Sequence, residues 1–203
     1  IFIKKIAGRM MAAQIGPSGL DTTLQANLGG NKVALWMPPG GSTTVPGVFG
    51  MAALTATGTA AARTVAVTNL LTRMTRLGYM SAATAGSVAG AREVAAKYTT
   101  GAGAGLGGFF ARYRFGVSDA ATVAGARMFV GLDTTTVAPT NVEPSAKANC
   151  VGVGQVSTSS NLQIIYGNAT AKAPIDLGSS FPADSNADAY ELSLFSPSTG
   201  GVF

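Results

Sequence analysis

Alternating apolar and polar positions predict a β-strand over Phe109–Val117. One parity of positions is apolar throughout: Phe109, Ala111, Tyr113, Phe115 and Val117. The other parity carries Phe110 and two arginines, Arg112 and Arg114. Because successive side chains in a strand point to opposite faces, this pattern is typical of a strand with one buried face.

A second strand is predicted over Arg127–Leu132, which repeats the alternation with Met128, Val130 and Leu132 on one face. The stretch between the two strands is rich in Ser, Asp, Ala and Gly. Such composition favours an irregular connection over a helix or strand. We therefore expect two strands joined by a small-residue loop.

The last third of the chain has the most regular pattern. Short apolar or alternating runs predict strands at Val151–Val156, Leu162–Tyr166, Ala173–Leu177 and Asp188–Phe195. Turns rich in Gly, Ser, Asn and Asp separate them, and no helical period is present there. These features predict an all-β fold, an antiparallel sandwich or jelly-roll domain.

The N-terminal region is broken by Gly and Pro. Ile1, Ile3 and Ile6 could form a short strand, and Lys32–Met37 is a second candidate. A segment interrupted so often cannot bury a core alone. We therefore expect an extended, irregular N-terminal arm over residues 1–48, packed on a neighbour or on the β domain of residues 49–203. The chain begins at Ile1, not at Met, so we expect further residues upstream.

The segment 51–98 is rich in Ala and Thr. Short strands are predicted at Thr64–Val67 and Arg73–Leu77, with Gly78 ending the second. A helix with Leu70, Met74 and Leu77 on one face is the alternative, but frequent Thr favours strands. Residues 87–98 are ambiguous in the same way.

Composition favours a chain that buries surface against copies of itself. Only 11% of the 203 residues are charged, roughly half the usual share, and the net charge is +5. The basic residues are scattered without a run of five or six, so a nucleic-acid patch is not expected. No apolar run reaches the roughly 18 residues that a membrane span needs, so a membrane-spanning segment is not expected either. The arginines are expected to bind carboxylates or to line an interface.

The residue types for common catalytic and metal chemistry are missing or scattered. Histidine is absent and Cys150 is the single cysteine, so His-based catalysis, an internal disulfide and His/Cys zinc sites are excluded. No pair of carboxylates is marked as a glycosidase site. The Gly103, Gly105 and Gly108 pattern precedes a strand, not a helix, and does not indicate a dinucleotide site. We therefore expect no enzyme and no cofactor.

Two single features keep two interpretations each, and a third, Cys150, has one. Asp184, Asn186 and Asp188 begin like a calcium loop, but the later positions fail, so a weak calcium site competes with an Asx-rich turn. Trp36 is a packing residue or a sugar-stacking platform. Cys150 is most simply a small buried hydrophobe.

Several segments between Gly108 and Phe195 resemble structural proteins of tailed bacteriophages, of the tail-fibre or minor virion type. The segments are Arg114–Asp119 (RFGVSD), Gly152–Gln155 (GVGQ), Leu162–Gly167 (LQIIYG), Pro174–Gly178 (PIDLG) and Ala187–Leu192 (ADAYEL). The resemblance implies a virion location and no catalytic residues. It also implies a homotrimer whose N-terminal arm docks on other virion proteins.

The expected function is therefore host attachment by a homotrimeric tail fibre, which binds a host surface glycan or protein through avidity. The alternative is a capsid- or collar-bound decoration protein that reinforces the particle. A carbohydrate-cleaving tailspike is a third, weaker hypothesis. The polar turns 157–161, 167–170 and 179–188 are expected at the exposed tip, and the receptor-contact candidates are Ser157, Asn161, Asn168, Asp184 and Asn186.

Overall fold

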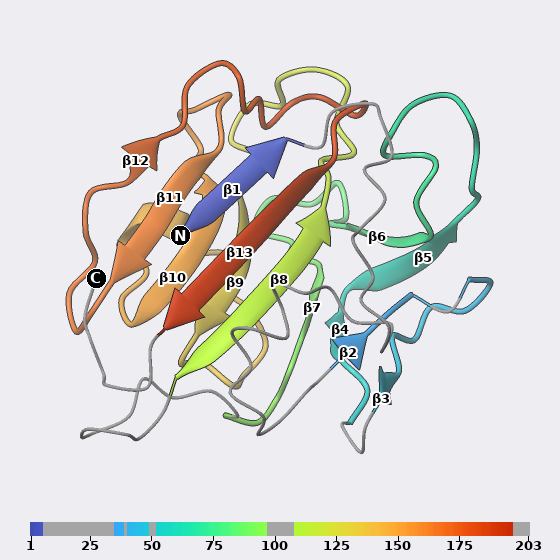
Figure 1. The fold of residues 1–203 in the computed structure, drawn as a ribbon. Coiled ribbons are helices and arrows are strands. Elements are labelled where there is room, and N and C mark those ends of the chain that lie inside the picture. Colours follow the sequence, from blue (N-terminus) through green and yellow to red (C-terminus); the bar gives the residue numbers. More distant parts are fainter. Residues whose placement is uncertain (6–34, 39, 49–51, 97–107, 197–203) are drawn as a thin grey trace, which may run out of the picture.

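The computed structural model describes residues 1–5, 35–38, 40–48, 52–96 and 108–196, and Figure 1 shows their arrangement. Within these ranges the all-β prediction is confirmed, because the regular elements are thirteen strands and one short 3-10 turn, η1 (Pro144–Ala146). The strands are β1 (Phe2–Lys5), β2 (Leu35–Trp36), β3 (Gly47–Val48), β4 (Thr55–Thr57), β5 (Thr59–Arg63), β6 (Arg76–Met80), β7 (Gly90–Arg92), β8 (Phe109–Phe115), β9 (Met128–Asp133), β10 (Cys150–Gln155), β11 (Gln163–Gly167), β12 (Ile175–Asp176) and β13 (Tyr190–Ser196).

Two antiparallel sheets face each other and form a sandwich. One has the strand order β1-β13-β8, and the other has the order β12-β11-β10-β9 (Figure 1). The second sheet is a simple meander, since its strands pair in chain order. Strand β1 lies within the range expected to form an arm and packs on the sandwich, which is one of the two alternatives left open for that arm.

The core between the sheets is built from the apolar parity of each strand. Its fully buried members include Tyr190, Leu192 and Leu194 from β13 and Val153 from β10. The inward positions predicted for β8 and β9 pack against them: Phe109, Ala111, Tyr113, Phe115, Met128, Val130 and Leu132. Alternation thus identified the inner face of both strands correctly, because the 2-residue period is a local property.

The connection 116–127 carries the chain from one sheet to the other. Strand β8 belongs to the three-stranded sheet and β9 to the four-stranded sheet, so the small-residue loop predicted between them crosses one end of the sandwich. Its first residues pack closely, because a Cβ added at Gly116 would overlap the Leu71 side chain and approach the Asp188 carbonyl oxygen at 2.9 Å. A small residue is required where these segments meet.

Outside the sandwich, residues 35–96 form three two-stranded sheets: β2 with β3, β4 with β7, and β5 with β6. The strand predictions there need correction. Thr64–Val67 is not a strand, and the pairing partners are Thr59–Arg63 and Arg76–Met80. Gly78 does not end the second strand but lies inside β6, where the Arg63 side chain crosses it. The helix alternative is wrong, because residues 64–75 form a loop.

Side-chain hydrogen bonds explain why that loop is not a strand. The Asn69 side-chain oxygen accepts the Thr72 amide at 2.9 Å, and the Thr72 hydroxyl donates to the Asn69 carbonyl at 3.0 Å. Asn and Thr offer the backbone such local partners in competition with a sheet ladder. Upstream, Gly58 adopts a positive φ of 69° and makes the turn between β4 and β5, which sets where β5 begins.

Trp36 donates its indole N–H to the Ala52 carbonyl at 2.9 Å and so joins β2 to the following segment. Within the described ranges, the structure holds no helix of the length and apolarity that a membrane crossing requires. The Gly103 and Gly105 positions of the glycine pattern, like Ile6 and Lys32, lie outside the described residues.

Candidate binding site

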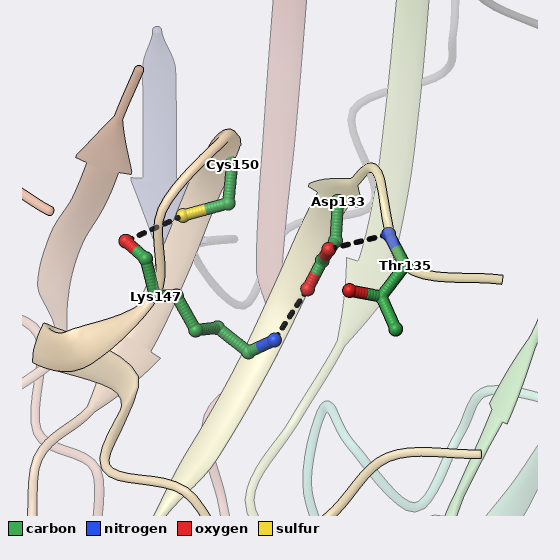
Figure 2. A network of polar contacts seen from close by, with 4 residues as sticks. All are labelled: Asp133, Thr135, Lys147 and Cys150. Atoms are coloured by element: carbon green, nitrogen blue, oxygen red, sulfur yellow. Dashed lines mark hydrogen bonds and ion pairs between the residues drawn. The ribbon is translucent and has the colours of Figure 1, made fainter. Parts of the chain in front are cut away.

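The outer face of the four-stranded sheet is covered by the loop between β9 and β10, and a polar network holds both ends of this loop (Figure 2). The Thr135 amide donates to Asp133 Oδ1 at 2.7 Å, and Lys147 Nζ donates to Asp133 Oδ2. The Cys150 thiol donates to the Lys147 carbonyl at 3.5 Å. These contacts fix the positions at which the loop leaves β9 and enters β10.

Electrostatics in this network follow from its partners. Burial alone would raise the pKa of Asp133, but hydrogen bonds from Lys147 and Thr135 outweigh it and hold that pKa below its ordinary value. Burial and the neighbouring Asp133 carboxylate raise the pKa of the Cys150 thiol, and Lys147 offsets part of this. The expectation that Cys150 is a buried hydrophobe is confirmed, with a weak thiol hydrogen bond added.

Two glycines let an aromatic ring lie on this outer face. Cβ atoms added at Gly131 and Gly152 would come within 3.1 and 3.0 Å of the Phe129 ring. The Lys147 ammonium stands 5.2 Å from the centre of the same ring, a cation–π distance. Phe129 also packs against the buried cluster that contains Ile165, so the ring connects the covering loop to the outer face of the sheet.

A shallow hollow of about 380 Å³ opens where this loop meets the β10–β11 turn. Its lining comes from four segments: Glu143 before η1 and Ser145 within it, Val156, Ser157 and Thr158 after β10, Gln163 at the start of β11, and Pro174 before β12. The turn is bonded to the loop, because the Ser157 amide donates to Glu143 Oε1 at 2.7 Å. Glu143 Oε2 also lies 3.8 Å from Arg127.

The sheet register explains why Gln163 is among the residues that line the hollow. Gln163 pairs with Asp176 on one side and with Gly154 on the other, so all three share the outer face. Gly154 contributes no side chain, and Pro144 lies above it, 3.5 Å from where a Cβ would be. Between Gly154 and Asp176, Gln163 therefore contributes the longest side chain of the three to the outer face, next to the edge of the covering loop.

Several polar groups of the hollow have no partner in the described part of the chain. The Gln163 side-chain oxygen is buried and accepts no hydrogen bond. The hydroxyls of Ser145, Ser157 and Thr158 likewise make no side-chain hydrogen bond to any described residue. A buried acceptor without a partner lowers the stability of the folded chain, so the Gln163 oxygen is an unusual feature of this part of the sheet.

The five candidates from the sequence fall in three places. Ser157 lines the hollow, and Asn161 ends the same turn, where its side-chain amide donates to Asp176 at 3.4 Å. Asn168 lies at the opposite end of β11, exposed, with its side-chain oxygen accepting the Thr170 amide at 3.2 Å. The structure therefore does not bring the 157–161 and 167–170 turns together.

The third turn lies beside the first. Asn161 forms an isolated bridge with Pro182, and the Ala183 amide donates to the Ser160 carbonyl at 2.7 Å. Asp184 and Asn186 then lead away from the hollow. Asp184 accepts the Thr122 hydroxyl at 2.5 Å, and the Asn186 carbonyl accepts the Asn69 side-chain amide at 3.5 Å.

No group of three or more Cys, Asp or Glu side chains with metal-binding spacing is found among residues that the structure describes. Asp184, the first position of the suspected calcium loop, is engaged by Thr122. The residues do not assemble a set of ligands there.

Sequence reasoning missed two residues that matter in this part of the molecule. Gln163 looked like an ordinary polar position in a strand, and only the register with β10 and β12 places it in the hollow. Glu191 lies on the face of β13 opposite to Tyr190, Leu192 and Leu194, yet it is only 4% exposed. Arg114 Nε donates to its Oε2 at 3.0 Å, and Arg112 lies 3.7 Å away, which confirms carboxylate binding for these two arginines.

Comparisons with protein-family models, with curated proteins and with solved structures find no match to this chain.

Proposed function

We propose that this chain is a structural, non-enzymatic protein of a bacteriophage virion. In this proposal it forms a homotrimeric tail fibre or similar external appendage that attaches the particle to its host. The N-terminal region contacts other virion proteins and the neighbouring copies, and the sandwich presents its loops outward. The resemblance of residues 108–195 to phage tail proteins supports the virion location.

One observation carries the assembly part of the proposal. The described residues of 35–96 expose many large apolar side chains: Leu35, Met37, Val48, Val65, Val67, Met80 and Val94. The same ranges hold few charges: Arg63, Arg73, Arg76, Arg92 and Glu93. Exposed apolar side chains with little charge between them are typical of surface that is covered in an assembly.

Two arginines of this region, Arg76 and Arg92, bind oxygens of the chain itself. Arg76 donates to the carbonyls of Thr64, Thr72 and Met74 at 3.4, 3.1 and 3.2 Å. Arg92 donates to the Thr57 hydroxyl at 2.8 Å. The chain thus lacks the charged surface that keeps monomers apart, which favours self-association through this region.

The mass of the purified chain in solution tests this proposal. Light scattering after size exclusion should give three times the chain mass of 20.3 kDa. The double variant Val67→Asp/Met80→Asp, which places charge at side chains that are 82% and 55% exposed, should dissociate the trimer. The control Val137→Asp changes a 66% exposed valine of the β9–β10 loop and should leave the mass unchanged.

A monomer at concentrations of tens of micromolar would overturn the trimeric appendage. Binding of that monomer to empty phage particles would then favour the decoration protein that reinforces a capsid or collar. Dissociation of the trimer by Val137→Asp but not by the double variant would place the interface on the sandwich and contradict the role given to residues 35–96.

A further inference from the structure

The charged residues are distributed unevenly between the two regions of the molecule. Residues 35–92 contain arginines but no lysine, aspartate or glutamate. The sandwich, residues 108–196, has more carboxylates than basic residues, and its carboxylates are Asp119, Asp133, Glu143, Asp176, Asp184, Asp188 and Glu191. The two regions therefore carry net charges of opposite sign, so the surface of one can attract the surface of the other across a contact between copies.

The composition of residues 35–92 favours a protein as the partner of this surface. Interface centres in proteins are enriched in Arg and Met and depleted of Lys, Asp and Glu. Residues 35–92 follow this pattern, since all their cations are arginines and Met37 and Met80 are 58% and 55% exposed. A surface for a phosphate polymer would use lysine as readily as arginine.

Loop 64–75 presents an exposed apolar side chain beside an exposed cation. Val67 is 82% exposed, and Arg73 Nη2 donates to the Val67 carbonyl at 3.3 Å. The nearest cross-strand charges repel, because Arg63 stands directly opposite Arg76 in the β5–β6 register. The matching surface should therefore supply a carboxylate next to an apolar side chain.

Among the sandwich carboxylates, Asp176 is the exposed one, and the other six are buried or half-buried. Three of those six already pair with cations of the same chain: Asp133, Glu143 and Glu191. Asp176 accepts hydrogen bonds from Asn161 and from the Gly178 amide, but it forms no ion pair with any residue that the structure describes. It is thus the carboxylate most open to a cation of another copy.

The position of Asp176 adds an apolar neighbour and an open strand edge. Asp176 and Ile175 form β12, and Ile175 is 49% exposed. Strand β12 pairs with β11 on one side, and no strand of the described chain pairs with it on the other. The β12 edge therefore offers an apolar side chain with a carboxylate, which is the counterpart of Val67 with Arg73.

Figure 1 shows β12 and the β5–β6 pair on opposite sides of the fold, β12 at the left and β5 and β6 at the right. One copy can therefore use both surfaces at the same time. A threefold ring requires this arrangement, because each of its contacts joins two different surfaces.

We propose that the Val67–Arg73 surface of one copy docks on the Ile175–Asp176 edge of β12 in a second copy. Three such contacts close the ring. The inference rests on the proposed homotrimer and deepens it, since it names the surface that receives residues 35–96. The apolar side chains supply most of the affinity, and the exposed ion pair of Arg73 with Asp176 fixes which surfaces meet.

Charge reversal on each side of the contact tests the pairing. Arg73→Glu and Asp176→Arg each place like charges together, so each should raise the concentration at which the trimer half-dissociates by about tenfold to hundredfold. The double variant Arg73→Glu/Asp176→Arg restores opposite charges and should return to within about threefold of the wild type. Sedimentation velocity over a dilution series of the full chain measures these concentrations.

Asp119→Arg is the matched control, because it makes the same change of net charge in the connection 116–127. It should leave the assembly unchanged, and Arg73→Glu/Asp119→Arg should remain as weak as Arg73→Glu alone. The inference is overturned if the double variant with Asp176→Arg shows no recovery, or if Asp119→Arg rescues Arg73→Glu equally well.

A cysteine pair tests the geometry without changing charge. With copper phenanthroline as the oxidant, Val67→Cys/Ile175→Cys should give covalently linked chains on a denaturing gel, up to three. Each single variant should stay uncrosslinked, because Cys150 is only 6% exposed. Covalent dimers from Val67→Cys alone would mean that like surfaces meet, which contradicts the proposed contact.

The same gels and light scattering separate this inference from the proposed function. A trimer that shows neither charge rescue nor cross-links through Val67→Cys/Ile175→Cys overturns this contact and leaves the appendage standing. A covalent ladder that extends beyond three chains supports the contact and overturns the trimer. A monomer overturns both.

Discussion

The sandwich and the region 35–96 are made of similar residues but bury them very differently. Both are rich in Ala, Gly, Thr and Val, and both pair their strands antiparallel. The sandwich has a core with several fully buried side chains. In the described residues of 35–96, the most buried large hydrophobics are Val45 and Leu71, which remain 7% and 8% exposed.

This difference in burial indicates where the stability of each region comes from. Two facing sheets enclose a core, whereas an isolated two-stranded sheet is marginal in water. Residues 35–96 hold three such pairs, joined to the sandwich by contacts such as Arg92 Nε to the Thr136 carbonyl at 3.3 Å. The sandwich is therefore expected to be stable on its own contacts, and the other region to depend on what it packs against.

Truncation of an apolar side chain should give the largest difference in the free energy of unfolding between the two regions. Leu192 is fully buried between the sheets, so Leu192→Ala should lower the free energy of unfolding by about 2–5 kcal/mol. Val67→Ala removes a similar apolar group from a site that is 82% exposed in the single chain, so at concentrations at which the chain is unassembled it should change that free energy by less than about 0.5 kcal/mol. Urea unfolding followed by far-UV circular dichroism, at one protein concentration, measures both.

Following the same unfolding by both circular dichroism and tryptophan fluorescence reports on the two regions separately. Trp36 is the single tryptophan and lies in β2, so its fluorescence reports on the region outside the sandwich. Leu192→Ala should shift the circular dichroism midpoint more than the fluorescence midpoint. Equal shifts of both would mean that the two regions unfold as one cooperative unit, which contradicts the comparison.

Gly152 in the sandwich and Gly90 in the region 35–96 should respond in opposite directions to alanine. A Cβ at Gly152 in β10 would overlap the Val130 carbonyl oxygen and lie 2.9 Å from the Gly131 Cα, so Gly152→Ala should cost about 3 kcal/mol. Gly90 in β7 has no heavy atom within 4 Å of its added Cβ, and its φ is not positive. Gly90→Ala should raise the free energy of unfolding by about 0.4–1 kcal/mol, through the unfolded state.

Thermal unfolding of the two glycine variants beside the wild type checks this pair. If Gly90→Ala were as damaging as Gly152→Ala, the region 35–96 would be packed as tightly as the sandwich. The role assigned to its exposed surface would then be wrong.

What the sequence predicted correctly is local, and what it missed depends on pairing at long range. The inner face of β8, with Tyr113 and Phe115, follows from a 2-residue period and needs no knowledge of partners. The strand Thr59–Arg63 was missed because its run of small residues, TAAAR, carries no alternation, and the loop after it is held by Asn69 and Thr72.

The residues that line the hollow could be predicted from the sequence only to the same extent. Ser157 was selected as a polar turn residue and does line the hollow. Gln163 and Glu143 reach that hollow because β11 pairs with both β10 and β12 and because the loop is held to Asp133. Glu191 is buried by arginines that lie 77 or more residues away in the sequence. None of these pairings is encoded in a short window of residues.

The smallest expected difference between paired variants is in the acid sensitivity of the sandwich. Hydrogen bonds from Lys147 and Thr135 outweigh burial and lower the pKa of Asp133 in the folded chain below its ordinary value of 3.8. A depressed carboxyl pKa adds stability that is present above that value and is lost as the pH falls through the folded pKa. Between about pH 5 and pH 2.5 the wild type should therefore lose about 1 kcal/mol more than Asp133→Asn does.

Lys147→Met is the companion variant, because it removes the strongest donor to the carboxylate and keeps a long side chain over Phe129. Its pH dependence should be nearly as flat as that of Asp133→Asn. Urea unfolding at a series of pH values, followed by circular dichroism, measures the slopes. If wild type and Asp133→Asn lose stability in parallel, the network of Figure 2 does not hold the loop in the way its contacts indicate.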